Sequence, residues 1–429
     1  MSIKEIDMNI EDKINMIFED NCDINIVTKE IKNILVSLKD NQKDFLYDLF
    51  KKISLFVQKL NLEDKFKDVK YFFKEIYNHI PNEEIKLKNI LLNEYEIATK
   101  QIVLKSYPRR IRMELTRKCN VSCIMCKVKD DYVKVLDKEI DDFLEIMPYI
   151  QEITLQGGEI FLDSRLNLIL DSIIKYQPTK LTVITNGLLL NEFWLEKLSK
   201  TNIELTFSID SLKKDVYEKI RIGGNFEKLM CNLKLASEIL KNKKLLLNMV
   251  VMKCNYKEIE DMIKFAGEYG FSEIHLNPVD GDVCKEENFF DYKIDENIIG
   301  EIKNKSEDYK KLAETHNIDL LNRLPQKEKK HIVVSNINIE NIKKCDMYCY
   351  SPFKQMFVSG NSHAPSCECI GVIDDIESLN EKKETNVFLQ KWNSFVMREY
   401  RKAMIEHREN IVCNKICKQY IGSRRNIIY

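Results

Sequence analysis

Apolar residues recur at helical spacing, between charged ones, through residues 1–105. Four stretches show the pattern: EDKINMIFED, TKEIKNILVSL, QKDFLYDLFKKISLFVQKL and LEDKFKDVKYFFKEIYNHI. An apolar stripe with this period is typical of amphipathic helices. Pro81 then opens the polar stretch PNEE, which favours the start of a further helix. We therefore predict a helical domain over 1–105 that covers, docks or oligomerises. The alternative is that this domain recognises a carrier or a substrate, but no particular residue indicates such a role.

From residue 106 to 281, strand patterns alternate with helix patterns. The predicted strands are IRMELT (111–116), EITLQ (152–156), LTVIT (181–185), IELTFSI (203–209), LLLNMVV (245–251) and EIHLN (273–277). Amphipathic stretches such as LNLILDSIIKY and EIEDMIKFAGEYG lie between them. Alternating units of this kind call for a parallel sheet with helices outside, in an α/β fold. Six units are too few for the eight-stranded barrel, so we predict a partial (β/α)6 barrel, with function on the loops at the carboxyl ends of its strands.

The remaining chain divides into two parts. Residues 282–344 predict a charged connector with a helix around 294–316. Residues 345–429 form a short region that holds six of the 13 cysteines. Because the cysteines are odd in number and mostly clustered, they favour metal ligation in a reducing compartment over disulfides.

Composition narrows the choice of partners. Lys and Arg total 67 and Asp and Glu total 68, so there is no general electrostatic drive toward nucleic acid or an anionic membrane. The first residues lack the apolar core of a signal peptide, and no uninterrupted apolar run of about 18 residues occurs. We therefore expect a cytoplasmic protein with neither a nucleic-acid nor a membrane partner.

The first cysteine cluster follows the first predicted strand of the barrel. Cys119, Cys123 and Cys126 have the spacing C-x3-C-x2-C. Three thiolates hold three corners of a cubane iron–sulfur cluster, and the missing fourth ligand leaves one iron open to an exogenous molecule. The alternative is a zinc knuckle with a distant fourth ligand.

This spacing, in this place, resembles the radical S-adenosylmethionine (SAM) superfamily. The resemblance implies a 4Fe–4S cluster on the three cysteines, with SAM bound to the open iron through its amino and carboxylate groups. It also implies reductive cleavage of SAM to a 5′-deoxyadenosyl radical that abstracts hydrogen from a substrate. Met125 stands where relatives often carry an aromatic residue, and it is apolar enough to cover the cluster.

Gly157, Gly158 and Glu159 follow the second predicted strand and resemble the family's GGE motif. The resemblance implies that they receive the amino group of SAM. Two glycines allow close approach of the backbone to a ligand, and a carboxylate pairs with an ammonium group.

Four more residues are predicted to complete the SAM site. Ser208, on the fourth strand, and Arg221, in YEKIRIGGNFEKL, resemble residues that relatives aim at the SAM carboxylate or ribose. For Arg221 the alternative is an ordinary arginine on a helix surface. Thr185 and Asn186 are predicted to line the same site, although Asn186-Gly187 is equally a turn signal.

The C-terminal cysteines resemble the extension of the SPASM/Twitch subgroup of radical SAM enzymes, in its shorter Twitch form. The resemblance implies one auxiliary 4Fe–4S cluster held by Cys349, Cys367, Cys413 and Cys417. Cys345 is an alternative to Cys349, and Cys369 to Cys367. Structural zinc on the same thiolates is the competing interpretation.

The expected function is hydrogen abstraction from a small sugar- or alcohol-like molecule, with the auxiliary cluster assisting an oxidation. A reductant such as flavodoxin or ferredoxin is implied. The alternative is a SPASM-type maturase that crosslinks or oxidises a peptide or protein, and a third possibility is a non-catalytic iron–sulfur or zinc protein. Asp210, Tyr217, Cys254 and Asp280 fall near the predicted barrel mouth, but no residue is assigned to substrate chemistry.

Overall fold

The computed structural model describes residues 24–37, 62–80, 82–126, 135–279, 284–288, 296–324, 351–359, 362–365 and 386–406. The predicted helical stretches EDKINMIFED and QKDFLYDLFKKISLFVQKL lie outside these residues, as do Asp280 and all six cysteines of 345–429. Among the described helices, none is both long and apolar enough to cross a bilayer.

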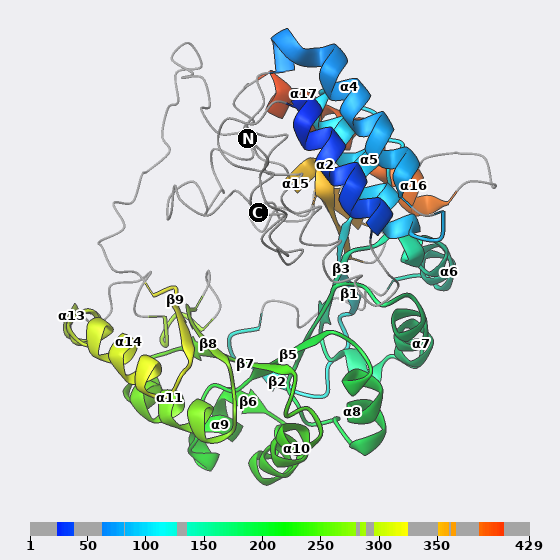
Figure 1. Ribbon diagram of the computed structural model, residues 1–429. Coiled ribbons are helices and arrows are strands. Elements are labelled where there is room, and N and C mark those ends of the chain that lie inside the picture. The colour runs from blue at the N-terminus through cyan, green and yellow to red at the C-terminus, as the bar shows by residue number, and fades with distance from the viewer. Residues whose placement is uncertain are drawn as a thin grey trace.

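A nine-stranded sheet forms the centre of the molecule, in the order β11-β10-β1-β3-β4-β5-β7-β8-β9 (Figure 1). Its strands are β1 (Arg110–Thr116), β3 (Glu152–Gly157), β4 (Lys180–Thr185), β5 (Ile203–Ser208), β7 (Lys244–Val251), β8 (Glu273–Pro278), β9 (Asp319–Asn322), β10 (Gln355–Ser359) and β11 (Ser362–Pro365). Neighbouring strands are parallel except β10 and β11. Within the described part of the chain the sheet stays open, since β9 and β11 are its two edges. The predicted partial barrel is therefore confirmed.

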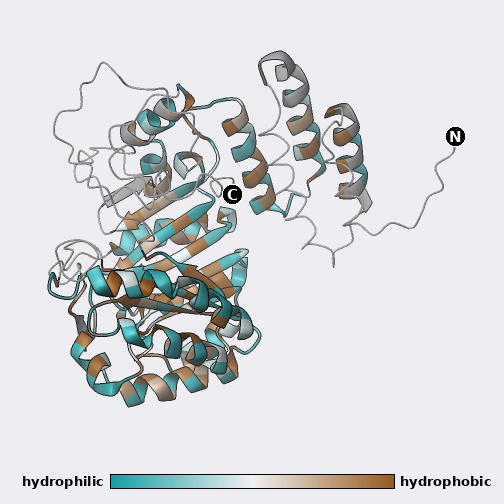
Figure 2. Ribbon diagram, turned by 90° about the vertical axis from the view of Figure 1, so that its left-hand side faces the viewer, coloured by the Kyte–Doolittle hydropathy of each residue, from teal (hydrophilic) through white to brown (hydrophobic). Residues whose placement is uncertain are grey.

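Helices cover one face of this sheet. They are α6 (Asp137–Ile146), α7 (Leu166–Tyr176), α8 (Glu192–Ser199), α9 (Lys214–Ile220), α10 (Phe226–Ile239) and α11 (Ile259–Glu268). Figure 1 shows them along the outer side of the strands, and Figure 2 shows that they mix hydrophobic and hydrophilic residues, as amphipathic helices do. Because strand side chains alternate, one set of β1, namely Ile111, Met113 and Leu115, is fully buried in the core.

The opposite, concave face of the sheet is mostly polar, although Ile184, Leu246, Val250 and Phe357 also lie on it. It carries Arg110, Arg112 and Glu114 of β1, Thr154 and Gln156 of β3, Thr182 of β4, Glu204 and Ser208 of β5, Asn248 of β7, and His275 and Asn277 of β8. Most of these side chains are only half-buried, whereas the helix-facing side chains are fully buried. The sheet therefore offers water and ligands a hydrophilic inner surface.

Three strands of the sheet, β9, β10 and β11, come from regions that the sequence analysis placed outside the barrel. The predicted helix around 294–316 is present as two helices, α13 (Glu296–Asn304) and α14 (Ser306–Thr315), and β9 then pairs with β8. Further along the chain, the short helix α15 (Ser351–Lys354) leads into β10, which pairs in parallel with β1. The strand that leads into the first cysteine cluster is thus an internal strand.

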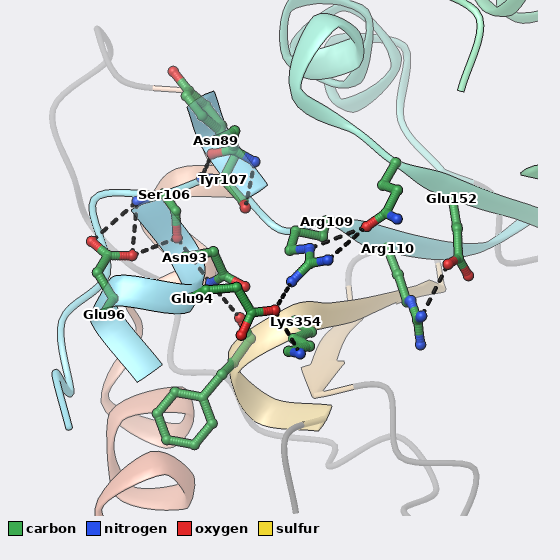
Figure 3. Close-up of polar contacts among 12 residues, drawn as sticks. Asn89, Asn93, Glu94, Glu96, Ser106, Tyr107, Arg109, Arg110, Glu152 and Lys354 are labelled. Atoms are coloured by element: carbon green, nitrogen blue, oxygen red, sulfur yellow. Dashed lines mark hydrogen bonds and ion pairs between the residues drawn. The ribbon is translucent and has the colours of Figure 1, made fainter. Parts of the chain in front are cut away.

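The N-terminal helices are α2 (Ile24–Ser37), α4 (Leu62–His79) and α5 (Ile85–Ala98), and they pack in that order. Helix α5 is tied to the amino end of the barrel (Figure 3). The Glu94 carboxylate pairs with Arg109, just before β1, and lies 2.8 Å from Lys354 Nζ, just before β10. Asn93 Nδ2 donates to the Phe353 carbonyl at 2.8 Å. Three distant parts of the chain therefore share one buried polar junction.

Two C-terminal helices, α16 (Val387–Trp392) and α17 (Phe395–Ile405), close over the same end. Arg401 is fully buried and donates to the carbonyls of Ile102, Pro352 and Trp392 at 3.0, 2.9 and 2.7 Å. A buried guanidinium needs such acceptors to replace water. Arg401 thus joins α17 to the segments that precede β1 and β10.

Candidate functional site

The first cysteine cluster lies on the loop after β1. Cys119 is exposed, Cys126 is half-buried, and Cys123 is buried on the two-residue strand β2 (Ser122–Cys123). Strand β2 pairs antiparallel with β6 (Arg221–Ile222), which places Cys123 opposite Arg221. The Ile124 amide also donates to the Ile220 carbonyl at 2.9 Å. The cysteine loop is therefore held by main-chain bonds to the segment that follows α9.

Gly157 and Gly158 bring the end of β3 into contact with this loop. The Gly158 amide donates to the Thr116 carbonyl at 2.7 Å, and the Glu159 amide donates to the Lys118 carbonyl at 2.8 Å. Gly157 has a φ of +132°, and a Cβ on Gly158 would lie 2.2 Å from the Lys118 oxygen. No side chain fits there. The two glycines thus serve the contact between the loops themselves, whatever they also do for a ligand.

Glu159 points away from solvent, toward the end of β4. Its side chain is fully buried, and its carboxylate accepts hydrogen bonds from Thr185 Oγ1 and the Asn186 amide, each at 2.9 Å. Burial raises the pKa of Glu159, and these donors oppose the shift. The carboxylate therefore positions Thr185 and Asn186, and its contact with the SAM amino group stays a prediction.

Asn186 connects the end of β4 with the cysteine loop. Its Nδ2 donates to Asn120 Oδ1 at 2.8 Å and lies 3.8 Å from Cys119 Sγ. Glu159, Thr185, Asn186 and Cys119 thus lie close together, and their role in one SAM site stays a prediction. Ser208 lies at the end of β5 in register with Asn248, and no described contact joins its side chain to the cysteine loop.

Arg221 is not on a helix surface; it is 5% exposed and lies behind Cys123. Its Nη1 donates to Cys123 Sγ at 3.6 Å, and its Nη2 lies 2.7 Å from Asp210 Oδ2. Burial by itself would lower the pKa of Arg221, but Asp210 and Cys123 raise it above the ordinary value. The guanidinium therefore keeps its charge beside the cysteine.

Sequence reasoning named Asp210 only as a residue near the barrel mouth and missed its pairing with Arg221. Asp210 is fully buried, and its Oδ1 accepts a hydrogen bond from the Val250 amide at 2.9 Å. The carboxylate closes β5, whereas Arg221 follows the next helix, so no local pattern marks the pair. The available signal was an acid at the end of an apolar strand, where burial demands a partner.

The donor set fits three corners of a cubane cluster. Three thiols without a disulfide lie on one loop, and a charged donor faces one of them. In the described part of the chain, no three His, Cys, Asp or Glu side chains converge on one ion position. A cubane takes each cysteine at a different iron, so three thiolates on one loop fit three of its corners. Desolvation raises the pKa of both Cys119 and the buried Cys123, so cluster binding must displace protons from these thiols.

An open parallel β/α sheet with a three-cysteine loop after its first strand is the arrangement that the sequence analysis expected for a radical SAM enzyme. In agreement, the Radical SAM superfamily model matches residues 113–266. Residues 113–266 are therefore similar to a radical SAM domain, which indicates an enzyme with a 4Fe–4S cluster and SAM as cofactors.

Two curated relatives and one solved structure show the extent of the likeness. A GTP 3′,8-cyclase of Synechocystis sp. is 30% identical over 193 residues, which are 41% of this chain and 57% of that protein. A probable GTP 3′,8-cyclase of Methanococcus maripaludis is 26% identical over 171 residues, or 38% and 56% of the two chains. The chain thus spans little more than half the length of these relatives.

The solved structure is that of Streptococcus suis SuiB bound to SAM. It superposes with a TM-score of 0.53 at 15% identity, over 85% of this chain and 84% of SuiB. That likeness shows the fold alone.

Proposed function

We propose that the protein binds its catalytic 4Fe–4S cluster through Cys119, Cys123 and Cys126 and abstracts hydrogen from a small polar molecule. When bound, the cluster and SAM supply the 5′-deoxyadenosyl radical that removes the hydrogen atom. The observation that carries the proposal is the meeting of three loops at the carboxyl edge of β1, β3 and β4. There the cysteine loop contacts Gly158 through the main chain and Asn186 through its side chain.

The chain's own residues would hold and shield these groups. The three cysteines would ligate the cluster, and the glycine pair holds the end of β3 against the cysteine loop. Ser208 and Asn186 offer hydroxyl and amide groups at the carboxyl ends of β5 and β4, and we propose them, with Thr185, as SAM contacts. Met125 and Ile124 pack against a small apolar cluster around Ile220, Met252 and Val279, which excludes water from one side of the loop.

The concave face of the sheet supports a small, hydrophilic substrate. Most of its charges are already paired: Arg110 with Glu152 at 3.0 Å, Lys180 and Lys244 with Glu204, and His275 with Glu273. Arg112 differs, because its Nε donates to Gln156 Oε1 at 2.7 Å and no carboxylate of the described residues pairs with it.

Gln156 directly precedes the glycine pair, so the Arg112 guanidinium lies beneath the proposed SAM site. A half-buried guanidinium with free donors suits a carboxylate or a phosphate. The matched relatives, named for a reaction of GTP, agree with an anionic small molecule.

A peptide is the second candidate substrate. SuiB, whose fold covers most of this chain, has also been solved bound to its precursor peptide SuiA. For either substrate we propose a C-terminal auxiliary cluster on Cys349, Cys367, Cys413 and Cys417, residues that lie outside the described ranges. Flavodoxin or ferredoxin is the proposed reductant.

Anaerobic purification, metal analysis and EPR spectroscopy with and without SAM test the proposal. About eight irons per chain, and a reduced spectrum that SAM perturbs, would support two cubane clusters. About four irons plus zinc would keep the radical SAM site and remove the auxiliary cluster. In Cys123→Ala we expect no 5′-deoxyadenosine under dithionite; retention of its formation would overturn the central assignment.

Small molecule and peptide are then distinguished by which one stimulates SAM cleavage. A polar small molecule that carries a carboxylate or phosphate should increase 5′-deoxyadenosine formation. The hydrogen gained by 5′-deoxyadenosine should come from that molecule. Stimulation by peptides alone would favour the maturase.

A further inference from the structure

The guanidinium of Arg221 is enclosed by protein on every side that the structure describes. One terminal nitrogen faces Asp210 and the other faces Cys123 Sγ, while Nε is buried without a hydrogen-bond partner among the described residues. The Asp210 carboxylate, in turn, is fully buried. To reach a ligand in the open part of the site, Arg221 would have to leave this carboxylate charged and unpaired in the core, which is strongly unfavourable.

The main chain locks the same pair of residues together. Cys123 and Arg221 are opposite each other in the β2–β6 ladder, and the amide of Ile124 bonds to Ile220. Asp210 is fixed from two directions, since its carboxylate accepts from the Val250 amide and its carbonyl accepts from Asn255 Nδ2 at 2.8 Å. The position of Arg221 relative to Cys123 is therefore set by β5, β6 and β7 together.

We propose that Arg221, held by Asp210, is a positioning residue for the cluster ligand Cys123 and does not bind the SAM carboxylate. A cationic donor to a ligating sulfur stabilises negative charge on it. Reduction adds an electron to the cluster, so the donor favours the reduced state and raises the reduction potential. Asp210 both aims the guanidinium and offsets part of its charge.

The inference predicts shifts of opposite sign for the two partners. Arg221→Gln removes a positive charge beside Cys123 and should shift the cluster's midpoint potential to more negative values. Asp210→Asn leaves the guanidinium charge uncompensated and should shift the potential to more positive values. Arg221→Lys keeps the charge without the planar fork, so its potential should lie between those of wild type and Arg221→Gln.

The experiment is an EPR-monitored redox titration of the anaerobically reconstituted full-length protein, together with SAM binding followed by the change in the reduced spectrum. Lys214→Gln is the matched control, because Lys214 is an exposed cation on α9 that pairs with Glu227 at the surface. We expect its potential to equal that of wild type. For Arg221→Gln we expect the negative shift with an unchanged dissociation constant for SAM.

An unchanged potential in Arg221→Gln, with SAM affinity at least tenfold weaker, would overturn the inference and make Arg221 a SAM ligand. A negative shift in Asp210→Asn would overturn it as well. If Arg221→Gln fails to retain iron, Arg221→Lys and Asp210→Asn carry the same test. A wild-type protein with no cluster signal would instead overturn the proposed function, so the two failures are distinguishable.

Discussion

Replacing Glu94 by glutamine removes the carboxylate that lies against both Arg109 and Lys354 where α5, β1 and β10 meet. The three side chains are only 2%, 9% and 12% exposed. The variant therefore leaves two cations close together and away from water. Breaking a buried ion pair in this way costs about 3–5 kcal/mol. With an unfolding entropy of about 2.1 cal/mol/K per residue, a 429-residue chain loses roughly 1 °C per kcal/mol, so the melting temperature should fall by roughly 3–6 °C.

The loss should depend on pH. Burial lowers the pKa of Lys354, and Glu94 opposes that shift. In Glu94→Gln the folded-state pKa of Lys354 is then further below the unfolded value of 10.5. The unfolded chain binds more protons over that interval, so the stability of the variant should rise as the pH rises toward 10.5. The deficit relative to wild type should be largest near neutral pH.

Thermal melts followed by circular dichroism measure this effect, with Glu75→Gln as the control. Glu75 pairs with Lys32 between α4 and α2, where both side chains are partly exposed and solvent screens the pair. The double variant Glu94→Gln/Lys354→Met should recover part of the loss, because one uncompensated cation is gone. Equal melting temperatures for Glu94→Gln and Glu75→Gln would refute the view that α5 is built into the barrel.

Three further outcomes are expected. Gly158→Ala should lose cluster iron and SAM cleavage, because its Cβ would lie 2.2 Å from the Lys118 oxygen. The control Gly300→Ala, whose Cβ would meet no atom within 4 Å, should behave as wild type in both assays. For any anionic substrate that stimulates SAM cleavage, Arg112→Gln should raise KM roughly tenfold or more, because a charged hydrogen bond is lost. Formation of 5′-deoxyadenosine without substrate should stay unchanged. An equal loss of substrate-stimulated and substrate-free formation would count against a substrate contact. Burial lowers the pKa of Lys86 from 10.5 to about 8, so the free energy of unfolding should rise with pH across that interval. Thermal melts below and above the interval should show this rise in wild type and not in Lys86→Met.

The sequence predicts those parts of the barrel whose signals are local. The six strands of 106–281 alternate with amphipathic helices, and Cys119, Cys123 and Cys126 mark their loop by spacing alone. By contrast, β9 has only four residues, DLLN, which are too few for a recognisable period. Strand β10 pairs with β1 across more than 200 positions of the chain, and no local pattern encodes such a pairing.

The local sequence also does not predict which partners the buried charged side chains face. GGE marks Glu159 as a functional carboxylate, but only the packing of β3 against β4 turns it toward Thr185 and Asn186. Arg221 was recognised as a residue of the site, yet its partner Asp210 depends on how β5 and β7 close around it. Motifs thus predict candidate residues, while tertiary contacts decide what each side chain faces.

The pairing of β10 with β1 has a consequence for how the protein is made. Ser359 Oγ donates to Glu114 at the end of β1, although the two residues are 245 positions apart. During synthesis, β1 and the cysteine loop emerge from the ribosome long before this partner exists, and one edge of β1 stays uncovered meanwhile. Such an edge invites pairing with other chains. We therefore expect the cluster to bind after β10 has been synthesised, because before then the strand that leads into the cysteine loop lacks one of its two neighbours.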